Sequence, residues 1–479
     1  MRRKRESINH DKRAIAIILT LLLLLTLTGV CAAQSEETGT TEEILNILKQ
    51  RGIVTGEEYE DLKKKAEEEK KKEEKEYTVK WNNGINVDRN DGAFKVKIGG
   101  RIHLDWGDIN PDSALKRNNR NGVYGNNELN GNGAEFRRAR LYVDGTLWER
   151  FLFKAQYDFA GQDADFKDVY LGLRDIPFLG ILRVGQMKEP ISLEELTSSN
   201  YITFMERSLP VVAFAPSRKT GIEVNNTILN KRMTWGVGAF YGDTDDDGDS
   251  DFNNNTRADI AFRLTGLPFY DDDGRRLLHL GLGYLFQARS EGGDRLRYRT
   301  RPESHLTDVR LVDTGSIAAK NANLLNPEIA FVWGPFSLQG EYFWNKVDST
   351  EANDPTFQGA YFFGSWFITG ENRPYSTKGG TFSRIKPKRN FLDDGGFGAW
   401  ELALRWSWID LNDENIQGGE ENNFTVGLNW YLNPNYRLMF NYVYADVKDR
   451  GPIEDADGNL ILTEDGDANI FQMRFQVDF

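Results

Sequence analysis

The final residues of the chain, FQMRFQVDF at 471–479, alternate without a break between apolar and polar side chains and end on an aromatic ring. Successive side chains of a β-strand point to opposite faces, so Phe471, Phe475 and Phe479 would share one face while Arg474 and Asp478 share the other. A strand with one apolar and one polar face, placed last and ending on phenylalanine, is typical of a membrane β-barrel.

The beginning of the chain indicates export. A basic segment precedes an apolar run from Ala14 to Val30, and the small residues Cys31, Ala32 and Ala33 follow before Gln34. This order predicts a secretory signal peptide at residues 1–33. Because Val30 rather than a small residue precedes the cysteine, we do not expect lipidation. Together the two ends indicate the bacterial outer membrane.

Composition is compatible with a barrel. The 479 residues carry a formal net charge of −13, and the mean hydropathy is −0.56. No second run of about 18 apolar residues could cross a bilayer as a helix, but barrel strands turn only every second residue toward lipid. Cys31 is the single cysteine, so we expect neither disulfides nor thiol chemistry in the mature chain. The alternative, a secreted β-sandwich or jelly roll, would need far fewer strands, with apolar faces turned toward a core.

Residues 34–78 are predicted to be a helical periplasmic or oligomerisation segment. Thr55 and Glu58 have the spacing of a capping box. Beyond Leu62 the sequence is almost entirely lysine and glutamate, with opposite charges four residues apart. The apolar stripe is too thin for a strong coiled coil, so a solvated spacer and a weak oligomerisation or cell-wall contact both remain open. Residues 79–93 are predicted to be a polar linker.

From residue 94 to the end, side chains alternate with a period of two. Phe94, Val96 and Ile98 alternate with Lys95 and Lys97, and the same pattern returns throughout this region. Roughly 386 residues, at about 24 for each strand and its connection, predict an all-β transmembrane barrel of about 16 antiparallel strands with a water-filled lumen. Short turns alternate with long polar loops, as expected when one end of the barrel faces the periplasm and the other faces outward.

Basic side chains gather on the polar faces of the first predicted strands. In a narrow, partly dehydrated pore such groups attract anions, and the planar guanidinium fork suits phosphate. The alternative is that they are solvated or paired with nearby aspartates, and the net negative charge means that any anion filter must be local. The basic residues are Arg101, Arg137, Arg138, Arg140, Lys154, Arg174, Arg183 and Lys188, and the aspartates are Asp105, Asp144, Asp158 and Asp168.

Several segments resemble the porin O and porin P family of phosphate-selective porins. They are GRIHLDWG at 100–107, FRRARLYVDGT at 136–146, LEELTSSNYITFMERSLP at 193–210, GAWELALRW at 398–406 and the last two strands. The resemblance covers nearly everything from about residue 95 onward. It implies a homotrimer of 16-stranded barrels in the outer membrane. It also implies that the third long loop folds into each lumen, where arginines draw phosphate to a narrow site.

The resemblance also implies roles for individual residues, carried over by position. Matching positions are Arg101, Arg137 and Arg138 for lumen arginines, Ser198 and Ser199 for loop serines, Arg207 for the arginine closing that loop, and Arg299 and Arg301 for an extracellular arginine ladder. One position departs from the family: selective members carry lysine where Glu195 stands. A carboxylate there would repel a dianion and could pair with Arg137 or Arg138. The departure weakens the expectation of high-affinity phosphate selectivity and leaves that of a general anion bias. Either Lys167 or Asp168 stands near the family's single lumen carboxylate.

Other signals are weaker. Asp243, Asp245, Asp247 and Asp249 partly match a calcium loop, but an acidic external loop is the simpler interpretation, and weak divalent binding that bridges to lipopolysaccharide is the alternative. His103, His279 and His305 have no nucleophile motif beside them, so we expect no catalysis, no cofactor and no nucleic-acid partner.

The expected partners are small anions such as phosphate or polyphosphate, outer-membrane lipid and two further copies of the chain. A non-selective porin, a cell-wall tether and, less favoured, a barrel enzyme remain as alternatives.

Overall fold

The computed structural model describes most of the chain. The described residues are 47–51, 54–74, 77–120, 129–161, 164–241, 258–289, 295–393, 395–451, 453–454, 460–461 and 463–479. The predicted signal peptide and the acidic loop at residues 243–251 lie outside them. The chain divides into two units, residues 1–78 and 79–479.

The first unit contains helix α2 (Gly56–Glu74). The predicted capping box is present, because the backbone N–H of Thr55 donates to Glu58 Oε2 over 2.8 Å and the N–H of Glu58 donates to Thr55 Oγ1 over 3.3 Å. The oppositely charged Asp61 and Lys65, four residues apart, lie 3.1 Å from each other. Within the described residues, no helix is long and apolar enough to cross a bilayer.

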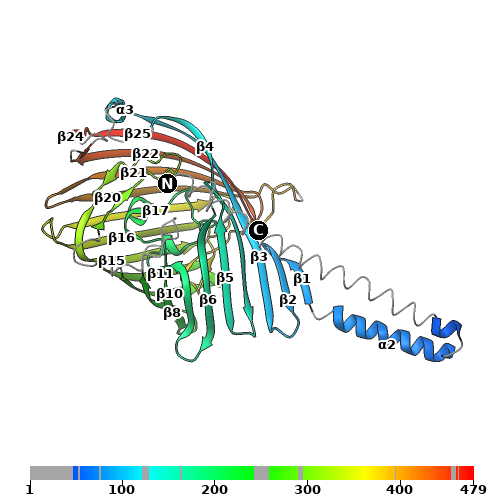
Figure 1. The fold of residues 1–479 in the computed structure, drawn as a ribbon. Coiled ribbons are helices and arrows are strands. Elements are labelled where there is room, and N and C mark those ends of the chain that lie inside the picture. Colours follow the sequence, from blue (N-terminus) through cyan, green and yellow to red (C-terminus); the bar gives the residue numbers. More distant parts are fainter. Residues whose placement is uncertain are drawn as a thin grey trace, which may run out of the picture. The chain divides into compact units, whose positions relative to one another are not determined.

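The second unit is a closed barrel of 16 antiparallel strands (Figure 1). Each strand pairs with the next along the chain, and β25 pairs with β3 to close the wall. The strands are β3 (Phe94–Pro111), β4 (Gly131–Leu147), β5 (Phe151–Asp158), β6 (Asp165–Ile176), β7 (Gly180–Lys188), β8 (Arg218–Ile228), β9 (Met233–Tyr241), β10 (Ala258–Asp271), β11 (Arg276–Ala288), β15 (Ile317–Trp333), β16 (Phe336–Ser349), β17 (Thr356–Phe367), β20 (Ala399–Asp413), β21 (Ile416–Tyr431), β22 (Tyr436–Arg450) and β25 (Gly466–Asp478). The predicted fold class is therefore confirmed.

The wall separates apolar from polar side chains as the alternation predicts. On β3, Ile102 and Trp106 are exposed on the outside, while His103 and Asp105 are buried. On β25, Phe475 is exposed beside residues that are buried. The outer surface is thus apolar, as is typical of a membrane barrel, whereas the lumen is polar.

The region predicted as a linker contains a hairpin instead. Strands β1 (Tyr77–Trp81) and β2 (Ile85–Arg89) pair with each other, and β2 pairs with the beginning of β3. Two positive backbone angles make the turn, φ 52° at Asn83 and φ 130° at Gly84. Asparagine followed by glycine favours a tight hairpin turn, and this local signal outweighs the polar composition of the segment.

Three connections contact inward-facing side chains of the wall. Residues 189–217, between β7 and β8, carry α4 (Leu193–Leu196) and α5 (Leu209–Phe214). Residues 289–316 carry β12 (Arg295–Leu296), β13 (Arg299–Thr300) and β14 (Val312–Asp313). Residues 368–398 carry β18 (Tyr375–Ser376) and β19 (Thr381–Phe382). The remaining short elements are α3 (Ser113–Arg120), η1 (Asp272–Gly274), β23 (Ile453–Glu454) and β24 (Leu460–Ile461).

Candidate functional site in the barrel lumen

The connection at 189–217, which we call the inner loop, is fixed to the inside of the wall. Glu341 of β16 accepts the backbone N–H groups of Leu193 and Glu194 over 3.1 and 2.8 Å. Arg437 of β22 donates to the carbonyl of Ile202 over 2.7 Å. Because these wall residues face inward, the inner loop lies in the lumen.

An aromatic side chain anchors the middle of this loop. Phe204 is buried, and its ring meets that of Phe363 on β17 edge to face, with ring centres 5.5 Å apart. The guanidinium of Arg405 on β20 lies 4.3 Å from the centre of the Phe204 ring. Such contacts hold the loop against the inside of the wall.

Two consecutive arginines of β4 both reach the lumen because of a β-bulge. His103 pairs with Arg138 and Leu104 with Phe136, so Arg137 has no partner in the register. A bulge inserts one residue into a strand and re-aims its side chain. Arg137 can therefore contact the inner loop from the same strand face as Arg138.

The carboxylate of Glu206 in the inner loop lies beside both of these arginines. Arg137 donates to it through Nε and Nη2 over 2.9 and 3.1 Å, and Arg138 Nη1 lies 3.8 Å away. Arg474 of β25 donates over 2.7 Å and also forms a bidentate pair with Asp105. Burial alone would raise the pKa of Glu206, but the arginines lower it well below its usual value. Glu206 and Asp105 together thus offset two of the three positive charges of Arg137, Arg138 and Arg474.

Arg101 on β3 has different neighbours. Its Nη1 donates to Ser199 Oγ over 2.8 Å and to Ser198 Oγ over 3.3 Å. Within the described residues no carboxylate lies at ion-pair distance from Arg101, and its Nε has no hydrogen-bond partner. A guanidinium beside two hydroxyl groups is thus available on the lumen side, and these are three of the residues that the sequence singled out.

Glu195 pairs with residues other than those anticipated. Its carboxylate lies 2.9 Å from Lys188 and 2.9 Å from Arg207, rather than beside Arg137 or Arg138. Burial raises the pKa of Glu195, but Arg207 and Lys188 outweigh burial and lower it. The register explains the difference, because α4 places Glu195 beside the end of β7 while the bulged arginines meet Glu206. Glu195 therefore offsets one of the two positive charges of Lys188 and Arg207.

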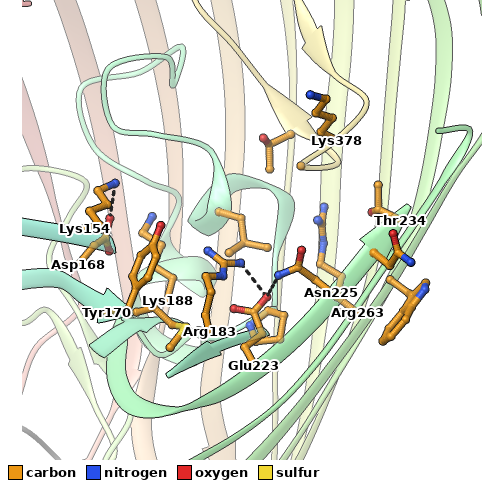
Figure 2. A pocket seen from close by; sticks show the side chains of 18 residues that line it. Lys154, Asp168, Tyr170, Arg183, Lys188, Glu223, Asn225, Thr234, Arg263 and Lys378 are labelled. Atoms are coloured by element: carbon orange, nitrogen blue, oxygen red, sulfur yellow. Dashed lines mark hydrogen bonds and ion pairs between the residues drawn. The ribbon is translucent and has the colours of Figure 1, made fainter. Parts of the chain in front are cut away.

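A cavity of about 270 Å³ lies between the inner loop and strands β5–β10 (Figure 2). Ion pairs line it: Lys154 and Asp168 are 3.0 Å apart, and Arg183 and Glu223 are 2.9 Å apart. Asp168 also accepts from Arg218, whereas Lys167 pairs with Asp165 and is not among the lining residues. The interpretation that basic residues pair with carboxylates therefore holds for this wall. Other lining residues are Tyr170, Lys188, Asn225, Thr234, Arg263 and Lys378.

The two arginines assigned to an extracellular ladder lie in the connection at 289–316. Arg301 donates to the carbonyl of Thr307 over 2.8 Å and to Asp308, while Arg299 is exposed on β13. Burial together with Arg301 and Arg299 lowers the pKa of a third arginine, Arg310, to about 10. Asp308 and Asp313 oppose this effect, so the three arginines share their surroundings with two aspartates.

Sequence reasoning missed several charged residues of the lumen. Glu206 stands next to Arg207 in the quoted motif, so that motif was a usable signal for it. Arg310 belongs to the same polar loop as Arg301 but is outside the RYRTRP segment. Lys378 and Arg384 lie in residues 368–398, and no pattern in that segment predicted its entry into the lumen.

Comparisons with known proteins agree with this geometry. The family model described as phosphate-selective porin O and P matches residues 96–479. Porin O of Pseudomonas aeruginosa is 24% identical over 424 residues, which cover 80% of this chain and 91% of that protein. An uncharacterised protein of Caulobacter vibrioides is 29% identical over 406 residues, which cover 84% of this chain and 77% of that protein. The solved structure of an anion-selective porin from Comamonas acidovorans matches with a TM-score of 0.50 at 14% identity, over 80% of this chain and 99% of that one.

Proposed function

The chain belongs to the family of phosphate-selective porins O and P, and from this premise we propose that its channel through the bacterial outer membrane favours small anions, phosphate among them. The observation that carries the proposal is the arrangement at Arg101. Its guanidinium contacts the hydroxyl groups of Ser198 and Ser199 and has no carboxylate at ion-pair distance among the described residues.

This arrangement suits an oxyanion. A guanidinium offers several N–H donors in one plane, and hydroxyl groups beside it can donate to further oxygens of the same anion. Carboxylates already offset part of the surrounding positive charge, because Glu195 lies beside Lys188 and Arg207 and Glu206 lies beside Arg137. An anion would therefore bind weakly at a single site around Arg101 and leave it readily, as conduction requires.

Phosphate block of chloride current in planar bilayers tests the proposal. We expect added phosphate to reduce the chloride current of the wild type, and Arg101→Gln to weaken this block by roughly tenfold because a charge-assisted contact is lost. Arg295→Gln is a matched control, since it removes one positive charge from an exposed ion pair with Glu351. Equal block in wild type and Arg101→Gln would contradict the proposed site.

Glu195 offers a test in the opposite direction. Glu195→Gln frees Lys188 and Arg207 from their carboxylate, and Glu195→Lys adds a further positive charge. We expect phosphate block to strengthen from wild type to Glu195→Gln and again to Glu195→Lys. Unchanged block in both variants would mean that Glu195 does not act on the permeating anion.

A general porin is the second candidate, and the ion pairs of the cavity favour it. Lys154 with Asp168 and Arg183 with Glu223 present both signs of charge along one wall. A channel governed by these pairs would discriminate little between chloride and potassium. Its phosphate block would be absent in the wild type and indifferent to Arg101→Gln.

The proposal extends to the surroundings of the channel. The exposed apolar residues on the outer wall support contact with outer-membrane lipid, and the family resemblance supports a homotrimer. For residues 34–78 we propose a periplasmic segment that contacts the cell wall or neighbouring copies. Native mass spectrometry in detergent of the full chain, and of a variant lacking residues 34–78, tests the trimer and the part that this segment takes in it.

A further inference from the structure

The seam that closes the barrel brings a carboxylate opposite Arg101. Asp478, near the end of β25, is the direct cross-strand partner of Arg101 on β3. Directly opposed side chains on one face of an antiparallel pair have Cβ atoms roughly 5 Å apart. Of the neighbouring carboxylates, Asp478 attracts Arg101 most strongly. An anion that approaches Arg101 therefore meets a potential competitor for the same guanidinium.

Asp478 nevertheless forms its ion pair with another residue, Arg384. Arg384 Nη2 donates to the Asp478 carboxylate and, over 3.2 Å, to the hydroxyl of Tyr201 in the inner loop. The Arg384 guanidinium also lies 5.3 Å from the centre of the Tyr201 ring and donates to the carbonyl of Pro434. The side chains of Arg384 and Asp478 are only 11% and 5% exposed, so water and salt screen this pair little.

Arg384 arrives from a part of the chain that other contacts hold in place. It belongs to residues 368–398, between β17 and β20, which enter the lumen from the barrel end where the other connections are short turns. In the same segment the Tyr375 hydroxyl lies 2.7 Å from His279 Nδ1, and Arg373 donates to Gln339 over 3.1 Å. The segment that carries Arg384 is therefore also anchored by contacts away from Arg101.

From this geometry we infer that Arg384 is a selectivity-determining residue that acts without touching the anion. By neutralising Asp478 it prevents that carboxylate from pairing with Arg101 and from repelling anions there. The inference rests on the proposed function, because it explains why the Arg101 site stays open to an anion. Arg384 is thus a positioning residue for this site.

Phosphate block and reversal potential of single and double variants test the inference. Arg384→Gln should release Asp478 toward Arg101, weaken phosphate block by roughly tenfold and shift the reversal potential toward cation preference. Adding Asp478→Asn to Arg384→Gln should restore both quantities to near wild-type values. Arg384→Lys should retain most of the block, since the charge remains. Lys386→Gln is the matched control, because it removes one positive charge from an exposed position of the same segment.

The outcomes separate this inference from the proposal on which it rests. If Arg101→Gln weakens the block but Arg384→Gln does not, the inference is wrong and the anion site stands. If Arg384→Gln weakens the block and Asp478→Asn fails to restore it, Arg384 acts through the segment rather than through Asp478, which also overturns the inference. If wild type and Arg101→Gln show equal block, the proposed function fails and the inference fails with it. Heat-modifiable electrophoretic mobility of each variant verifies that the barrel has formed.

Discussion

Arg137 and Arg138 are consecutive residues of β4, and both reach the lumen. Strict alternation of side chains along a strand would direct one of two consecutive arginines toward lipid. The bulge at Arg137 instead lets both side chains point into the lumen. The family motif indicated these arginines, but nothing local in the sequence gives the bulge, because it depends on the register with β3. Their partner Glu206 was missed for a related reason, since the pair joins residues 69 positions apart.

Glu206 gives a prediction at this scale. Glu206→Gln leaves Arg137, Arg138 and Arg474 with one carboxylate fewer, so the lumen becomes more positive. We expect the reversal potential in a KCl gradient to shift further toward anion preference, whereas the exposed control Glu351→Gln should not shift it. A shift toward cation preference in Glu206→Gln would contradict the view that this carboxylate offsets the arginines.

The same residue predicts a pH dependence. The pKa of Glu206 is lowered well below its usual value of 4.5, so its ion pairs stabilise the folded loop above that value and are lost only as the pH falls through the lowered pKa. The difference in reversal potential between wild type and Glu206→Gln should therefore be constant from about pH 8 to about pH 5. A difference that disappears already near neutral pH would show that Glu206 is protonated there.

At the scale of elements, the inner loop and residues 368–398 differ in how predictable they were. The family resemblance implied that the third long loop enters the lumen, and the contacts of Glu341 and Arg437 place it there. For residues 368–398 the expectation of short turns at one end of the barrel is wrong. Burial of Phe382 and Arg373 against the wall holds this segment inside, and such long-range packing leaves no periodic signal in the sequence.

Phe204 tests the anchoring of the inner loop. Phe204→Ala removes a buried ring that packs on Phe363 and Arg405, and such truncations in protein cores cost about 3–5 kcal/mol. We expect a looser loop, seen as larger single-channel conductance and greater open-channel current noise. Phe178→Ala, at a position 95% exposed in a turn, should leave both unchanged. Identical conductance and noise in Phe204→Ala and wild type would mean that the loop does not limit the current.

At the scale of the whole molecule, the barrel was predictable because each strand carries its own period-two pattern. The barrel closes where the last strand, β25, pairs with the first strand, β3. The alternating apolar and polar side chains of the last strand already indicated such a closure. The pairing of many lumen cations with carboxylates was less accessible, because it depends on which distant residues meet. Net charge alone therefore says little about selectivity, and we propose that the local surroundings of Arg101 decide it.

The reversal potential of the purified full chain in a planar bilayer, under a KCl gradient, is the most direct test of an anion-favouring lumen. We expect anion preference in the wild type and a clear loss of that preference in Arg101→Gln. Cation preference in the wild type would contradict an anion-favouring lumen, whatever the channel conductance.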